Sequence, residues 1–223
     1  TDDLTETAVE LTLGREGMRS AFGPRRLRLE ILDYPGEWLL DLPLLEQSFP
    51  EWSRQTLARL RQGIRSEVFA PFLAQIAGLD PGAAPEHETV RRLHESYRDA
   101  LRAAQHEHGL RLLQPGRFLC PGPGADAPFM WLFPLEGTPA YPLHGTLADL
   151  LHRRFEAYKA DMRARFFERH FARFDRQVLL VDVLGALHGG REVFHDTQAA
   201  LALIAASLSY RTERGLVWPR QGT

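Results

Sequence analysis

Residues 29–38 read Leu-Glu-Ile-Leu-Asp-Tyr-Pro-Gly-Glu-Trp, and the fold class depends on this stretch more than on any other. Apolar and charged side chains alternate before it and within it, with Leu27, Leu29 and Ile31 on one side and Arg28 and Glu30 on the other. This period-two pattern predicts a strand with one covered face. The strand is expected to end at Asp33, and the Tyr-Pro-Gly that follows predicts a sharp turn.

An aspartate at the carboxyl end of a strand, followed by a glycine turn, suits a magnesium–nucleotide site. The Asp33 carboxylate can hold a metal-bound water, which makes it the candidate metal-binding residue. Gly36 is the candidate nucleotide-binding residue, because its N–H can approach a terminal phosphate closely. Glu37 can orient an attacking water and accept its proton, which makes it the candidate catalytic residue. Taken alone, the stretch is more often an ordinary strand and turn, with Glu37 paired to a surface arginine.

The composition indicates a globular protein in a reducing compartment. The 223 residues carry a net charge of -2, which gives no indication of nucleic-acid binding. Cys120 is the only cysteine and cannot form an internal disulfide, which favours the cytoplasm. The longest apolar run near the end, residues 199–208, is far shorter than the roughly 20 residues that span a bilayer.

Periodicity predicts a chain that mixes strands and helices. Residues 5–13 alternate like residues 27–33, so the two segments are expected to form an antiparallel hairpin. Three long segments show helical spacing, at about 51–78, 86–108 and 146–174. A proline-rich stretch between the second and third segments predicts a long irregular connection.

The last part of the chain predicts a return to the sheet. Residues 176–185 form a nearly continuous apolar run, which predicts a strand buried on both faces, and residues 192–208 predict a covering helix. The order predicts an α/β fold with core strands and turn in 1–45, a helical insertion in 46–175, and a core strand and helix in 176–223.

Asp182 ends the apolar strand pattern Val-Leu-Leu-Val-Asp at residues 178–182. Ligands of open α/β sheets collect at the carboxyl ends of strands, so Asp182 is a second candidate nucleotide-binding residue. An acidic residue at this place serves more often as a helix cap or turn residue, and that interpretation is favoured.

The segment expected as a helix at 146–174 is both basic and aromatic. From Arg153 to Arg176, eight basic side chains stand against four acidic ones, a local charge of +4. A basic amphipathic helix can lie on an anionic membrane. Aromatic residues at helical spacing pack more often in a protein core, and this second interpretation is preferred.

Several segments together resemble one family, the YcjX-like P-loop NTPases, bacterial proteins associated with stress regulons. The resemblance runs from about Thr5 to Tyr210. Its most specific part is Asp-Tyr-Pro-Gly-Glu-Trp-Leu-Leu-Asp-Leu-Pro at residues 33–43, and further matches include Gly-Arg-Phe-Leu at 116–119, Arg-Phe-Glu-Ala-Tyr-Lys at 154–159 and the run 166–185.

The resemblance implies a P-loop NTPase core, similar to Ras-like and Gα proteins, with helices inserted into it. It also implies binding of GTP or ATP with Mg²⁺ and hydrolysis of the nucleotide. By motif, Asp33 corresponds to the aspartate on the metal side and Gly36 to the backbone that senses the γ-phosphate.

The sequence departs from this family pattern in two places. A P-loop reads Gly-x₄-Gly-Lys-[Ser/Thr], but the only lysine, Lys159, lies inside an expected helix. The Thr-Lys-Ala-Asp type of base-recognition motif also needs a lysine. The chain begins at Thr1, so we expect a portion of a longer NTPase that alone binds nucleotide weakly or not at all. Whether the chain itself is an enzyme is left open.

A non-catalytic module is the alternative. It would be built on the basic aromatic segment 146–174 and would bind a protein or lie at the periphery of a membrane.

Overall fold

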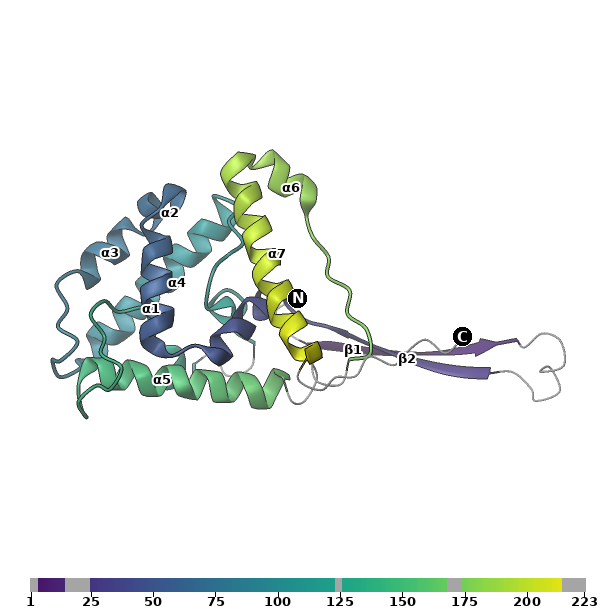
Figure 1. Ribbon diagram of the computed structural model, residues 1–223, viewed down its shortest axis with the longest axis horizontal. Coiled ribbons are helices and arrows are strands. Elements are labelled where there is room, and N and C mark those ends of the chain that lie inside the picture. The colour runs from purple at the N-terminus through teal and green to yellow at the C-terminus, as the bar shows by residue number, and fades with distance from the viewer. Residues whose placement is uncertain (1–3, 15–24, 123–125, 168–173, 214–223) are drawn as a thin grey trace.

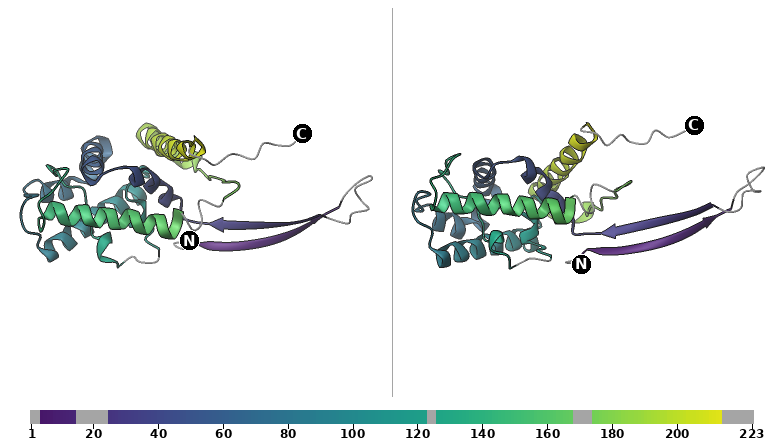
Figure 2. Two further views of the ribbon diagram at one scale, coloured as in Figure 1. Left: turned by 60° about the horizontal axis from the view of Figure 1, so that its bottom comes forward. Right: turned by 90° about the horizontal axis from the view of Figure 1, so that it is seen from below.

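The computed structural model describes residues 4–14, 25–122, 126–167 and 174–213. Figure 1 shows a body of packed helices from which one long β hairpin projects. The hairpin points away from the helices in the further views of Figure 2 as well. The described chain is therefore of mixed α and β structure, mainly helical, with a two-stranded sheet.

The predicted hairpin is confirmed. Strands β1 (Thr5–Leu13) and β2 (Arg25–Asp33) pair antiparallel, with Val9 opposite Leu29. The expected cover over the apolar face is wrong, however, because the six apolar side chains of that face remain 39–48% exposed: Val9, Leu11, Leu13, Leu27, Leu29 and Ile31. Alternation fixes which side chains share a face, but no described element packs on that face.

The predicted turn after β2 opens a 3-10 helix, η2 (Gly36–Glu46). Residues 51–78 do not form the expected single helix but belong to three: α1 (Phe49–Leu60), α2 (Gly63–Val68) and α3 (Ala70–Ile76). Gly63 has a φ of +52°, which a continuous right-handed helix cannot include. The backbone N–H of the next residue, Ile64, donates to the Glu192 carboxylate at 2.7 Å.

The second helix, α4 (His87–His106), agrees with its prediction. The proline-rich connection contains two short 3-10 turns, η3 (Gly116–Phe118) and η4 (Pro128–Met130). The third segment forms α5 (Leu147–Met162) and the π-helical η5 (Arg163–Phe167), and its residues 168–173 lie outside the described chain. Thr146 caps α5 by accepting the N–H of Asp149 at 3.2 Å.

The aromatic side chains of α5 lie in the protein core, as preferred from the sequence. Phe155 and Tyr158 are fully buried, and the Phe155 ring stacks on Trp52 with 5.2 Å between centroids. The basic side chains that the structure describes from Arg153 to Arg165 all have partners within the chain. Lys159 donates to the Gln47 carbonyl at 2.9 Å, and Arg154 donates to the Trp131 carbonyl at 2.7 Å.

The strand predicted at residues 176–185 is wrong for the described chain. Residues 176–182 are extended but unpaired, and residues 183–185 belong to α6 (Val183–His188), which leads to α7 (Gly190–Glu213). Figure 1 shows the extended segment running alone from the base of the hairpin to α6. Val178 and Leu180 are 83% and 89% exposed, because an apolar run predicts a buried strand only where neighbouring strands pair with it.

Two hydrophobic clusters hold the helices together. The larger lies among α1 to α5, and these helices with their connections are called the helical body below. The smaller joins η2 to the ends of other elements, with Trp38, Leu39 and Leu40 packed against Met162 of α5 and Ile204 of α7. Within the described residues, no helix has the combination of length and apolar character that a bilayer crossing requires.

Candidate functional site

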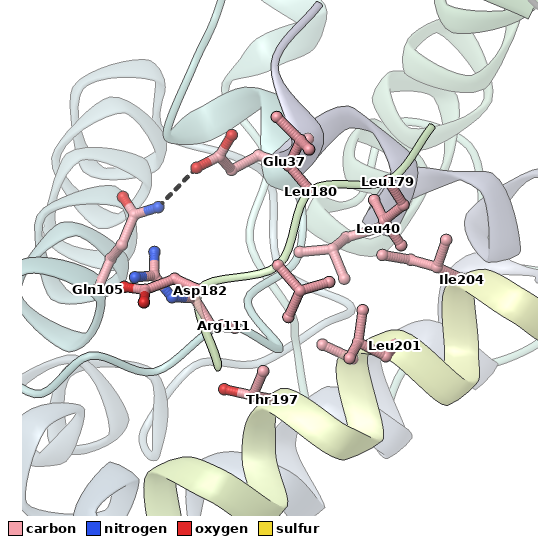
Figure 3. A pocket seen from close by; sticks show the side chains of 13 residues that line it. Glu37, Leu40, Gln105, Arg111, Leu179, Leu180, Asp182, Thr197, Leu201 and Ile204 are labelled. Atoms are coloured by element: carbon pink, nitrogen blue, oxygen red, sulfur yellow. Dashed lines mark hydrogen bonds between the residues drawn. The ribbon is translucent and has the colours of Figure 1, made fainter. Parts of the chain in front are cut away.

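A pocket of about 310 Å³ lies where η2, the extended segment before α6, and α7 meet. Figure 3 shows polar side chains gathered at one end and leucine and isoleucine side chains at the other. The pocket is lined by Gly36, Glu37, Leu40, Gln105, Arg111, the run Leu179–Asp182, Thr197, Ala200, Leu201 and Ile204. Three of the four candidates from the sequence therefore meet here, Gly36, Glu37 and Asp182.

The start of η2 offers unused hydrogen-bond donors to this pocket. Trp38 donates its N–H to the Pro35 carbonyl at 3.1 Å. The N–H groups of Gly36 and Glu37 have no acceptor among the residues that the structure describes. Gly36 is exposed, and apart from its two chain neighbours no described residue has an atom within 4 Å of the place where a Cβ would stand. Free N–H groups at the start of a helix favour an anion such as a phosphate.

Glu37 is held from two sides by the helical body. Its Oε1 accepts a hydrogen bond from Nε2 of Gln105, on α4, at 2.8 Å (Figure 3). Its backbone carbonyl lies so close to Gly116 that a Cβ on Gly116 would stand 1.9 Å from the oxygen. Position 116 therefore requires a glycine, because the two backbones approach too closely for a side chain. Together the two contacts fix the Glu37 carboxylate beside the pocket.

Asp182 serves as the cap that was favoured from the sequence. Its Oδ1 accepts the N–H of Gly185 at 2.8 Å and so closes the first turn of α6. The predicted strand end is absent, so in the described chain Asp182 does not stand at the edge of a sheet. The residue nevertheless lines the pocket with Glu37.

Asp33 lies outside the pocket. It is the last residue of β2, stands opposite Thr5, and is exposed. Among the described residues, no three His, Cys, Asp or Glu side chains gather as a metal cluster. Magnesium bound with a nucleotide needs only one or two carboxylates, since phosphates and waters supply the other ligands. The free N–H groups of η2 and the nearby carboxylates fit a terminal phosphate and such an ion.

Asp41 anchors η2 to the helical body and was missed as a site residue. The buried carboxylate accepts the N–H groups of Gly116 and Arg117 at 2.7 and 3.1 Å, and the hydroxyl of Tyr158. Burial raises the pKa of Asp41 to about 6, while these hydrogen bonds and the Arg117 charge lower it. The side chain thus joins η2 to η3 and α5. Its presence within the specific motif 33–43 was the available signal.

Asp196 is a second anchor that the sequence did not reveal. Its carboxylate, on α7, accepts the N–H groups of Arg111 and Leu112 at 2.6 and 3.0 Å. It also pairs with Arg65 of α2 at 2.6 Å, and both side chains are buried. An acidic residue among the apolar positions of a helix is a weak signal, and nothing in the sequence identifies its partners far along the chain.

Comparison with known proteins places these observations in a family. A model of the YcjX-like family, DUF463, matches residues 1–218. A protein of Escherichia coli named Ras-like GTPase YcjX is 40% identical over 191 residues, which cover 82% of this chain and 41% of that protein. A Ras-like GTPase YcjX of Shewanella oneidensis is 36% identical over 219 residues, which cover 92% of this chain and 45% of that protein. The chain therefore matches less than half of the length of these relatives.

Proposed function

The chain belongs to the YcjX-like family, and from this membership we propose that it contributes the switch-type turn and part of the nucleotide site of a Mg²⁺-dependent GTPase. The observation that carries the proposal is the meeting of Gly36, Glu37 and Asp182 around one pocket, beside two unused N–H donors. GTP is favoured over ATP because both relatives are named as Ras-like GTPases.

Each candidate residue has a part in the proposed reaction. The N–H groups of Gly36 and Glu37 would bind the γ-phosphate, Asp33 would hold a water of the Mg²⁺ ion, and Asp182 would line the nucleotide site. Glu37 orients a water whose oxygen forms a bond to the γ-phosphorus. The bond from that phosphorus to the bridging oxygen breaks, its electron pair leaves with GDP, and the water proton passes to Glu37.

The helical body is proposed as an insertion into a P-loop domain, with the divisions 1–45, 46–175 and 176–223. A role in a stress response rests on the family resemblance alone, and a cytoplasmic location rests on the single cysteine, Cys120. Both are part of this proposal. The membrane-peripheral alternative is not adopted. The five cations described from Arg153 to Arg165 all have intramolecular partners, namely Asp149, the Trp131 carbonyl, Gln47 with Glu156, the Leu45 carbonyl and Asp161.

The test is GTP hydrolysis by the complete gene product that carries this chain, in the presence of Mg²⁺. Replacing Glu37 with alanine is expected to lower kcat about 100-fold, because general base catalysis contributes roughly 10²–10⁴-fold. Glu46→Ala is the matched control, since this glutamate lies exposed at the other end of η2. A Glu37→Ala protein with the kcat of the wild type, or a wild-type protein that does not hydrolyse GTP, contradicts the proposal.

A further inference from the structure

Arg111 is the cation of the candidate site. Among the pocket-lining residues it is the one basic side chain, and it shares the polar end with Glu37, Gln105 and Asp182 (Figure 3). It comes from the segment directly after α4, so the helical body supplies it to a pocket whose other walls are η2, residues 179–182 and α7.

The backbone of Arg111 is fixed while its guanidinium is unused. Asp196 accepts the N–H groups of Arg111 and of Leu112, and Arg65 binds both Asp196 and the Leu112 carbonyl, the latter at 2.8 Å. The Asp196 and Arg65 side chains are 5% and 7% exposed, so this anchor is buried. Within the described chain, the Arg111 guanidinium makes no hydrogen bond or ion pair.

The Arg111 guanidinium does not serve to neutralise the neighbouring carboxylates. It forms no ion pair with Glu37 or Asp182, although both line the same pocket. Glu37 binds the neutral amide of Gln105, and Asp182 binds the backbone of α6. A guanidinium has five donors in a fork that matches the oxygens of a phosphate. An anchored arginine with free donors beside free N–H groups is arranged to bind an anion.

We propose that Arg111 binds the terminal phosphate of the nucleotide at Gly36 and is supplied in cis by the helical body. This inference rests on the proposed function. An arginine at this place stabilises the negative charge that develops on the phosphate oxygens during transfer to water. It also makes hydrolysis depend on the position of the helical body relative to η2.

The experiment measures nucleotide binding by calorimetry, with the complete gene product that carries this chain. The probes are GDP and the non-hydrolysable β,γ-imido analogue of GTP, both with Mg²⁺, and the matching adenine pair forms a second arm. Arg111→Ala is expected to weaken the triphosphate analogue about 10- to 100-fold, the range for hydrogen bonds to a charged group. GDP affinity is expected to stay unchanged, and Arg111→Lys to recover part of the loss.

The matched control is Arg102→Ala on α4, whose exposed side chain lies 3.9 Å from Asp99. The melting temperature of Arg111→Ala should equal that of the wild type, because the side chain has no described partner to lose. Equal losses for GDP and the triphosphate analogue, or no loss for either, overturn the inference. If the wild-type protein binds none of the nucleotides, the proposed function fails and this inference fails with it. If the wild-type protein binds only the triphosphate and Arg111→Ala binds it equally well, the inference is overturned while the proposed function stands.

Discussion

At the scale of single residues, burial shifts the pKa values of two titratable side chains in opposite directions. Burial raises the pKa of Asp41 from 3.8 to about 6. Burial lowers the pKa of His94 from 6.5 to about 4, and its hydrogen bond to the Leu132 carbonyl, at 3.2 Å, opposes the shift. Both groups therefore titrate on unfolding within the same range of pH, and the neutral form of each is the better buried one.

The two shifts have opposite effects on the free energy of unfolding. The contribution of Asp41 is complete below pH 3.8 and is lost as the pH rises to about 6. The contribution of His94 is complete above pH 6.5 and is lost as the pH falls to about 4. Each amounts to on the order of 3 kcal/mol. We expect them to compensate in the wild-type chain, which flattens its stability between pH 4 and 6.

Single substitutions should reveal separately how each side chain makes the free energy of unfolding depend on pH. With Asp41→Asn, the free energy of unfolding is expected to fall relative to wild type as the pH is lowered from 6.5 to 4, because the His94 contribution is then lost without the compensating gain from Asp41. With His94→Gln, it is expected to fall as the pH is raised from 4 to 6. Urea unfolding at several pH values measures both. Parallel pH profiles for the two variants and the wild type would contradict the assignment.

The candidate site residues differ in how far the sequence reveals them. Gly36 and Glu37 could be chosen because the chemistry of a phosphate site is concentrated in one short turn. Gln105 could not, because a glutamine beside the apolar residues of α4 has no pattern that points to Glu37, 68 positions away. Arg111 was equally hidden, since its value as a site residue depends on the Asp196 anchor that only the folded chain brings to it.

At the scale of elements, α7 is tied to the helical body by one buried ion pair. Replacing Asp196 with alanine leaves Arg65 charged and buried, and it leaves the N–H groups of Arg111 and Leu112 without their acceptor. Breaking a buried pair from one side costs about 3–5 kcal/mol. We expect Asp196→Ala to lower the free energy of unfolding by that amount, as measured by urea denaturation.

Two further variants separate the ion pair from the backbone contacts. Gln198→Ala, at an exposed position of α7, is the control and should change the free energy of unfolding by less than about 0.5 kcal/mol. The double variant Asp196→Leu with Arg65→Met removes both charges, so it should recover stability in part but not fully, because the two N–H groups stay unpaired. A loss below about 1 kcal/mol for Asp196→Ala would show that the anchor is dispensable.

Elements whose pattern is local were predicted best. The hairpin follows from alternation, and α4 from apolar residues at helical spacing. The segment 51–78 was predicted as one helix because its apolar spacing continues through Gly63, where the backbone in fact turns into the left-handed region. Residues 176–182 show the other limit. The apolar run indicates that these residues require packing partners, but it does not indicate whether a neighbouring strand supplies them.

At the scale of the whole molecule, the nucleotide contacts available to the chain are few. No Gly-x₄-Gly-Lys-[Ser/Thr] occurs in the sequence, and a P-loop supplies many of the phosphate contacts in NTPases. We predict that the 223-residue chain alone binds GTP with a dissociation constant above about 100 μM, weaker than about 5.5 kcal/mol. Calorimetry with Mg²⁺ and GTP measures this, with the complete gene product as reference. Low-micromolar binding by the chain alone would refute the prediction.

The position of Lys159 gives the chain a chemical reporter of its own. This sole lysine side chain is 9% exposed, and its ammonium group is held by the Gln47 carbonyl and Glu156. Amine-reactive reagents therefore meet no open lysine while α5 is docked on the residues before α1. Acylation of Lys159, read by mass spectrometry, would time the release of α5 from that position. The same scarcity means that lysine-directed cross-linking and surface labelling report on this one position and on no other side chain.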